Sequence, residues 1–183
     1  MIKVIAFDLV GVLVHEKDVD LTLEEEKLER LFGDNIGDAD YLVNARKIIS
    51  KDSIIMQTTL DIINKLYTVD EKTVLKKIKT KYPDIKLVIA TNHVSYVRDY
   101  IGENIGVDYI DNVIISAEIH KTKPGSDFFE YILDLYNIKP RELLFLDDSK
   151  RNIDGANSIG IKTIKVNKDT NIYKEICLVI ENK

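Results

Sequence analysis

Three aspartates are the side chains of this sequence best placed to do chemistry. Asp8 ends an apolar run that begins at Val4, and Asp147 and Asp148 end another that begins at Leu143. Three carboxylates at the ends of two buried strands would repel one another strongly unless a cation compensated their charge. Magnesium prefers oxygen ligands and is typically held by one or two carboxylates together with a substrate phosphate. We therefore expect Mg²⁺ and a phosphate ester at these residues.

Two further polar positions would complete a phosphoryl site. A hydroxyl and a backbone amide at Thr91 and Asn92, where a predicted strand opens into a helix, can bind phosphate oxygens. Lys123, held beside Pro124 in a predicted loop, would add a positive charge that steadies the nucleophile and the transferring phosphoryl group. Lys121 competes for this role, but the proline that follows Lys123 favours the latter.

The elements that must position these residues alternate between strands and helices after Pro83. Short apolar, β-branched runs are typical of strands buried on both faces of a parallel sheet. Their alternation with helices predicts an α/β fold, a doubly wound Rossmann-like parallel sheet with right-handed crossovers, whose ligands bind beyond the carboxyl ends of the strands. We expect strands in the run before Asp8 and at 87–90, 113–115, 143–146 and 162–166, and helices at 94–101, at 126–136 with Ser126 as the cap, and at 151–159, closed by Gly160.

Residues 16–82 interrupt this alternation with a helical pattern. Thr22 and Glu25 form a capping box ahead of apolar residues at helical spacing. We therefore predict an α/β core domain of residues 1–15 and 83–183, with a helical cap of residues 16–82 inserted after the first strand. Further cap helices are expected at 38–49, 53–67 and 70–81, the last ended by Pro83.

Four segments, in order, resemble the motifs of the haloacid dehalogenase-like (HAD) superfamily. They are Phe-Asp-Leu-Val-Gly-Val-Leu at 7–13, Ala-Thr-Asn at 90–92, Lys-Pro at 123–124 and Phe-Leu-Asp-Asp-Ser-Lys-Arg-Asn-Ile-Asp-Gly-Ala at 145–156. The resemblance covers essentially the whole chain outside the insertion, and its strength lies in the order of all four motifs at predicted strand ends. It implies a HAD-like hydrolase of the subfamily IA type, whose small helical cap closes over the substrate and selects it.

The resemblance also implies a role for each residue. Asp8 would be the nucleophile that forms an aspartyl-phosphate, Thr91 would bind the phosphoryl oxygens, and Lys123 would neutralise charge. Asp148, with Asp147 beside it, would hold magnesium together with Asp8. The implied activity is magnesium-dependent hydrolysis of a small phosphorylated metabolite, such as a sugar phosphate.

Val10 is the main departure from the family pattern. Most phosphatases of the family carry a second aspartate two residues after the nucleophile, which protonates the leaving oxygen and then activates water. A valine cannot transfer a proton, and losing a general acid or base typically costs about 10²–10⁴ in rate. Val10 keeps a backbone carbonyl, which the family uses as a metal ligand, so the implied magnesium site survives the change.

Three functions remain open. We favour a phosphatase whose substrate has a better leaving group, such as a sugar 1-phosphate or an acyl phosphate, or whose proton comes from another residue. A branch resembling alpha-glucose-1-phosphate phosphatase also lacks the aspartate, and its Asp-Asp-x-x-x-Asn segment is similar to Asp147, Asp148 and Asn152. A haloacid dehalogenase is less consistent, because dehalogenases do not use magnesium. The third is a phosphate-binding or regulatory protein without turnover.

The three histidines give few candidates for the missing acid. His15 follows the first strand closely and could be a substitute acid near the hinge of the cap, and His93 follows the expected phosphate-binding residue Asn92. Most single histidines at such places are solvated or structural. We expect a structural role for His120.

Composition narrows the class of protein. The 183 residues are 45% apolar and 31% charged, which is typical of one globular domain with a modest insertion. The net charge of −5 and the scattered lysines argue against nucleic-acid binding, and no stretch reaches the roughly 18 apolar residues of a membrane span.

A lone cysteine, Cys177, in an apolar run suggests burial and a reducing compartment. Asp8 interrupts the apolar start and no cleavage site follows, which argues against a signal peptide, so we expect a cytoplasmic protein. The sequence does not determine the substrate or the oligomeric state.

Overall fold

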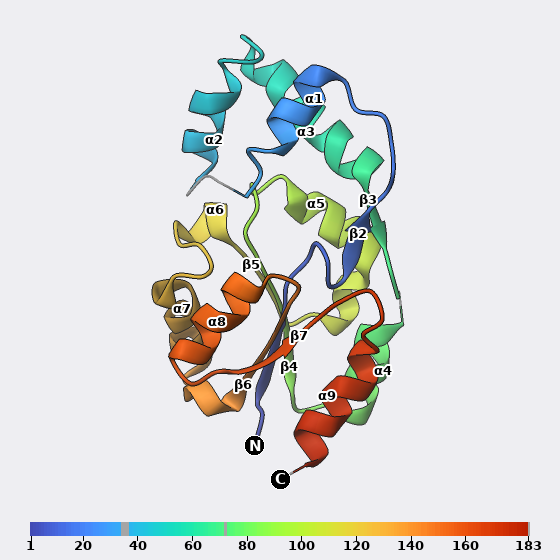
Figure 1. Ribbon diagram of the computed structural model, residues 1–183, viewed down its shortest axis with the longest axis vertical. Coiled ribbons are helices and arrows are strands. Elements are labelled where there is room, and N and C mark those ends of the chain that lie inside the picture. Colours follow the sequence, from blue (N-terminus) through green and yellow to red (C-terminus); the bar gives the residue numbers. More distant parts are fainter. Residues whose placement is uncertain (34–36, 72, 183) are drawn as a thin grey trace.

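A parallel sheet forms the centre of the computed structural model, which describes residues 1–33, 37–71 and 73–182 (Figure 1). Within these residues five strands lie in the order β5-β4-β1-β6-β7. Phe7 at the end of β1 pairs with Ile89 of β4 and with Leu146 of β6, so the three central strands end within two residues of one another at the same edge of the sheet. The strands are β1 (Val4–Phe7), β4 (Lys86–Thr91), β5 (Asn112–Ile115), β6 (Leu143–Asp147) and β7 (Lys162–Lys165).

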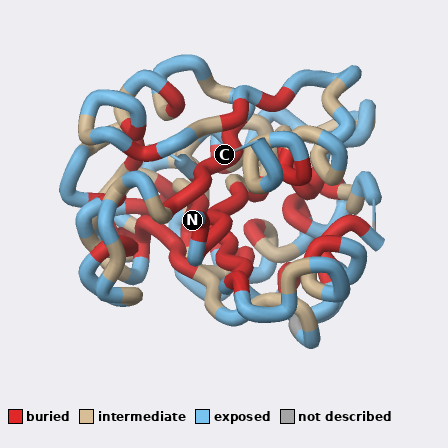
Figure 2. Tube along the Cα trace, turned by 90° about the horizontal axis from the view of Figure 1, so that it is seen from below, coloured by how far each residue is buried: buried red, intermediate tan, exposed pale blue. Residues whose placement is uncertain are grey.

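Helices cover both faces of this sheet, as the doubly wound prediction requires. Ile5 and Phe7 of β1 pack in one apolar cluster, with residues of α4 (Val74–Lys81), α5 (Val97–Ile101) and α9 (Ile172–Glu181). Val4 and Ala6 pack in a second cluster, with residues of α7 (Ser126–Tyr136) and α8 (Lys150–Ser158). The buried residues accordingly run through the middle of the molecule (Figure 2). The α/β fold class predicted from the sequence is thus confirmed.

The core elements differ from the prediction mainly at their ends. Gly160, with a φ of +84°, follows α8 as expected. Ser126 is the first residue of α7 and not its cap, because the N-cap position is taken by Gly125, which has no side chain to cap the helix. α5 begins at Val97, three residues later than predicted. Shorter helical elements are α6 (Ser116–Ile119), a π-helix at Gly102–Gly106 and 3-10 turns at Val107–Tyr109 and Pro140–Glu142.

α9 has no counterpart in the prediction. Its apolar run from Ile176 to Ile180 is too short to indicate a helix by itself. Asn171 begins the helix, because its side chain accepts a hydrogen bond from the amide of Lys174 at 3.0 Å. The burial expected for Cys177 is confirmed, since this side of α9 packs toward α4.

Three helices make up the inserted segment above the sheet: α1 (Leu23–Glu29), α2 (Asp38–Ala45) and α3 (Asp52–Leu66). The capping box is confirmed, because the Thr22 hydroxyl accepts from the Glu25 amide and the Glu25 carboxylate accepts from the Thr22 amide. α2 ends at Ala45, four residues earlier than predicted. Residues 34–36 and 72 of the expected cap lie outside the described part of the chain.

Two short strands connect the inserted helices to the sheet domain. β2 (Val14–Glu16) and β3 (Tyr67–Val69) pair antiparallel, and neither was expected from the sequence. The helix expected at 70–81 begins only at Val74, and this helix, α4, packs against α9 of the core. The cap boundaries at 16 and 82 stay a prediction, and the contacts of α4 favour an end of the cap at β3. No helix in the described ranges is long and apolar enough to cross a membrane.

Candidate active site

Asp8 stands at the carboxyl end of the central strand. Its amide donates to the carbonyl of Leu146 at 2.8 Å, which continues the pairing of β1 with β6 by one residue. Its Oδ1 accepts from the Leu9 amide at 2.7 Å and lies 2.8 Å from Nζ of Lys123. The side chain is 13% exposed. Asp8 is therefore held in one orientation while its carboxylate stays accessible.

The turn that follows Asp8 packs against Asp148. The carbonyl of Leu9 accepts from the amides of Leu13 and Val14, which closes a tight turn around Gly11. Gly11 has a φ of +82°, and a Cβ at this position would lie 2.5 Å from Cγ of Asp148. Glycine is favoured here, because a side chain would strain the left-handed backbone and displace the carboxylate of Asp148. Val10, whose carbonyl is a predicted metal ligand, thus sits in a turn fixed beside a predicted ligand carboxylate.

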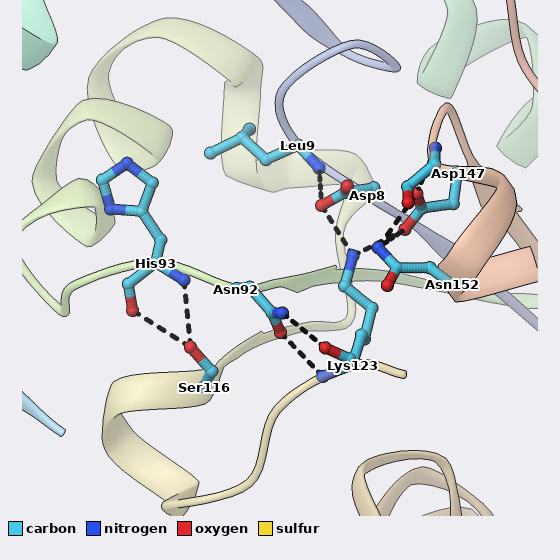
Figure 3. A network of polar contacts seen from close by, with 9 residues as sticks. Asp8, Leu9, Asn92, His93, Ser116, Lys123, Asp147 and Asn152 are labelled. Atoms are coloured by element: carbon cyan, nitrogen blue, oxygen red, sulfur yellow. Dashed lines mark hydrogen bonds and ion pairs between the residues drawn. The ribbon is translucent and has the colours of Figure 1, made fainter. Parts of the chain in front are cut away.

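Lys123 joins the carboxylates of two strands. Its fully buried side chain lies 2.8 Å from Oδ1 of Asp8 and 2.8 Å from Oδ2 of Asp147 (Figure 3). The amide side chain of Asn92 holds the lysine loop, because Nδ2 donates to the Lys123 carbonyl and Oδ1 accepts from the Lys123 amide, both at 2.9 Å. The side chain of Asn92 therefore positions Lys123, which leaves its backbone amide as the group predicted to bind substrate.

The two neighbouring aspartates have different surroundings. Asp147 is fully buried, and besides Lys123 it accepts from the Ser149 amide at 2.7 Å and from Nδ2 of Asn152 at 3.1 and 3.2 Å. Asp148 is exposed and lines a cavity of about 1030 Å³ together with Gly11. Asp147 is thus occupied by protein donors, whereas Asp148 faces the cavity. Sequence reasoning did not assign Asn152 to the site, although its place in the fourth motif was a usable signal.

The cluster carries more negative charge than Lys123 neutralises. Oxygens of Asp8, Asp147 and Asp148 lie within 4.8 Å of one another. Burial raises the pKa of Asp8 to about 7, with a further contribution from Asp147, although Lys123 opposes the shift. Burial and the neighbouring Asp147 also raise the pKa of Asp148. An all-oxygen donor set of this charge suits a hard divalent cation such as Mg²⁺.

Thr91 is the last residue of β4, and His93 follows it by two residues. Thr91 is buried at the end of the strand that pairs with β1. His93 is buried as well, with Nε2 2.9 Å from the hydroxyl of Tyr67 and its ring centroid 5.1 Å from that of Phe32. Its amide donates to the Ser116 hydroxyl at 3.0 Å. Burial lowers the pKa of His93 to about 4, so the side chain is neutral at pH 7. Its contacts with Phe32 and Tyr67 connect the inserted segment to the core.

The remaining candidates lie in less enclosed places. Lys121 is partly exposed and lies 3.4 Å from Asp127, away from the acidic cluster that Lys123 joins. His120 ends α6 with a φ of 53°, and Gly37 of the inserted segment comes close to its ring. His15, in β2, contacts Asp70 just beyond β3.

Fold and site together define a parallel α/β protein with an acidic, cation-suited centre at the carboxyl edge of its sheet. A family model for the haloacid dehalogenase-like hydrolases matches residues 9–166, and the chain belongs to this family. As a HAD-like hydrolase it carries the Asp8 cluster where the strands β1, β4 and β6 end together.

Among the known proteins that are similar to this chain are one curated relative and two solved structures of HAD-family proteins. The chain is 25% identical over 75 residues to a D-ribitol-5-phosphate phosphatase of Bacteroides thetaiotaomicron, a match that covers 41% of this chain and only 36% of that protein. A HAD-like family hydrolase of Porphyromonas gingivalis superposes over 100% of both chains, with a TM-score of 0.77 and 22% identity. A HAD-family enzyme of B. thetaiotaomicron, solved with magnesium and inorganic phosphate, covers 93% of this chain and 97% of its own, with a TM-score of 0.70 and 19% identity.

Proposed function

We propose that this protein is a magnesium-dependent phosphatase of a small phosphorylated metabolite, such as a sugar or polyol phosphate, with Asp8 as the nucleophile. The observation that carries the proposal is the convergence of Asp8, Asp147 and Asp148, the first two of which contact the buried Lys123. The phosphatase activity named for the B. thetaiotaomicron relative, and the magnesium and phosphate in the solved structure from that organism, support it.

Some side chains of the site position Asp8, and others would bind the phosphoryl group. Lys123 and the Leu9 amide keep Oδ1 of Asp8 in place, so the carboxylate is oriented for attack on phosphorus. Thr91 and the Asn92 amide would bind the phosphoryl oxygens, and the Lys123 ammonium would stabilise the charge that develops on them.

The predicted ligands of Mg²⁺ are Asp8, the Val10 carbonyl and Asp148, with Asp147 behind them. When bound, the ion would supply charge neutralisation and orientation of the phosphate. Asp148 is the ligand that faces the cavity, and Gly11 allows the Val10 turn to approach it. Asp147 would act mainly by holding Lys123.

A panel of phosphate esters tests the proposal. We expect the purified protein to release phosphate with Mg²⁺, to lose this activity in EDTA, and to lose it by at least about 10³-fold in Asp8→Asn, because the amide is a poor nucleophile. Asp127→Asn, at an exposed carboxylate away from the cluster, is the matched control and should keep the activity. The same assay with 2-chloropropionate tests the dehalogenase alternative, for which halide release would need no Mg²⁺.

A protein that binds phosphate without turnover is the outcome that contradicts the proposal. It would bind inorganic phosphate with Mg²⁺ by calorimetry yet release none from any ester, including acyl phosphates and p-nitrophenyl phosphate.

A further inference from the structure

The proposed reaction needs a proton donor that the acidic cluster does not contain. Asp8 attacks phosphorus, Asp147 is occupied by Lys123, Ser149 and Asn152, and Asp148 is assigned to the cation. Val10 carries only hydrocarbon. The leaving oxygen must nevertheless take up a proton, and the water that later attacks the aspartyl-phosphate must lose one.

A histidine–aspartate pair joins the two short strands β2 and β3 and lines the cavity that Asp148 also lines. His15 is the middle residue of β2, and its Nδ1 contacts Oδ1 of Asp70, the residue after β3. His15 pairs opposite Thr68, so the contact joins the two strands that link the inserted helices to the core. A carboxylate on one ring nitrogen orients an imidazole and leaves the other nitrogen for a ligand. The His15 side chain is 57% exposed and therefore open to a ligand.

The pair shares a cavity with the predicted magnesium ligand. His15, Asp70, Gly11 and Asp148 all line the cavity of about 1030 Å³. A β-bridge between Val10 and Val14 places the first residue of β2 beside the valine that offers no proton, and His15 is the next residue along. The other charged side chains that line this cavity are Glu16, Glu71, Lys165, Lys168 and Asp169.

His93 does not compete for this role. It is buried, its Nε2 faces the Tyr67 hydroxyl at 2.9 Å, and its Nδ1 lies 3.1 Å from the Val94 carbonyl. Both ring nitrogens are thus occupied by protein groups. Of His15 and His93, only His15 combines an orienting carboxylate with access to the cavity that Asp148 lines.

We propose that His15, oriented by Asp70, is the proton-transfer residue of this enzyme, an inference that rests on the proposed phosphatase function. The Asp8 carboxylate forms its bond to phosphorus as the bond to the leaving oxygen breaks, and protonated His15 gives its proton to that oxygen. Neutral His15 then takes a proton from water as the water oxygen bonds to phosphorus and the bond to Asp8 breaks. Phosphate leaves, and His15 is protonated again for the next cycle.

The dependence of rate on the leaving group tests this role, because a purely structural residue would affect all substrates alike. We expect His15→Gln to lower kcat/KM for alkyl phosphates by about 10²–10³-fold, and to change it less than about threefold for p-nitrophenyl phosphate and acyl phosphates, whose leaving groups need no proton. Asp70→Asn should show the same pattern with a smaller loss. Glu16→Gln, at the next residue of β2, is the matched control and should follow the wild type on every ester.

The second half of the cycle gives an independent readout. With p-nitrophenyl phosphate, His15→Gln should give a burst of nitrophenol followed by slow turnover, and mass spectrometry should find phosphorylated Asp8 accumulating. In His15→Ala, added imidazole should restore hydrolysis of alkyl phosphates, which keeps the test valid if the glutamine variant fails to fold.

Two outcomes would overturn the inference and are distinguishable. If the wild type is active and His15→Gln loses rate equally on all esters, or loses none, His15 is not the proton-transfer residue although the phosphatase function stands. If the wild type releases no phosphate from any ester with Mg²⁺, the proposed function itself fails.

Discussion

At the scale of single residues, Lys123 is the group on which the acidic cluster depends. It is the buried cation that contacts both Asp8 and Asp147, at 2.8 Å each. Burying carboxylates without such a partner is costly, because the charge loses its water. The raised pKa of Asp8, about 7, shows that Lys123 only partly offsets this cost.

Removing this ammonium should therefore destabilise the metal-free protein. We expect Lys123→Met to lower the free energy of unfolding by about 3–5 kcal/mol, since it leaves two buried carboxylates without their partner. Urea denaturation in EDTA measures the change, and added Mg²⁺ should restore part of it. Lys121→Met, at the partly exposed lysine beside Asp127, should change stability by no more than about 0.5 kcal/mol. Equal losses in the two variants would show that the buried contacts are unimportant.

At the scale of elements, the turn after β1 decides where the predicted ligands meet. Its hydrogen bonds run from Leu13 and Val14 back to Leu9, and Gly11 lets it pass against Asp148. The same turn leads directly into β2, whose His15 lines the same cavity as Gly11 and Asp148.

Alanine substitutions at two glycines of similar conformation distinguish the effect of backbone strain from the effect of contact with Asp148. Gly11 and Gly106 have φ values of +82° and +80°, but a Cβ at Gly106 would meet nothing within 4 Å. Each alanine variant should lose about 1–2 kcal/mol of stability from the left-handed backbone. Gly11→Ala alone should also weaken Mg²⁺ binding by tenfold or more, measured by calorimetry with inorganic phosphate present, because Asp148 must move. Unchanged Mg²⁺ affinity in Gly11→Ala would contradict the predicted ligand role of Asp148.

At the scale of the whole molecule, a buried aromatic cluster joins the inserted helices to the core. Phe32 from the segment after α1 and Tyr67 from β3 both contact His93, directly after the predicted phosphate-binding residues. The ring of Tyr67 also meets that of Tyr100 in α5 edge-on. The orientation of the inserted helices is thereby connected to the strand end that is predicted to bind phosphate.

Protonation of His93 should weaken this junction at acid pH. Its pKa is about 4 in the folded protein and about 6.5 when unfolded, so the unfolded chain binds more protons between these values. Stability should then fall as the pH drops from 6.5 to 4, by about 3 kcal/mol from this residue. Chemical denaturation of the wild type and of His93→Gln across this range measures the difference. Parallel pH profiles for the two proteins would refute the assignment.

The sequence by itself determined the parts of this protein that depend on local pattern. Short apolar runs that end in Asp8 and in Asp147 predicted the strands and, because parallel strands end at one edge, the meeting of their carboxylates. The capping box at Thr22 and the span of α7 also follow from residues within a few positions of one another.

Only the tertiary structure decided how those residues share their contacts. Neither the burial of Asp147 against Lys123 nor the exposure of its neighbour Asp148 has a local signal, because each depends on loops distant in the sequence. The hinge strands and α9 escaped prediction for the same reason: three-residue strands form only when residues 14–16 meet 67–69, and α9 gains its burial from α4. Contacts between distant segments set burial, and burial sets which carboxylate is held by protein groups and which one faces the cavity.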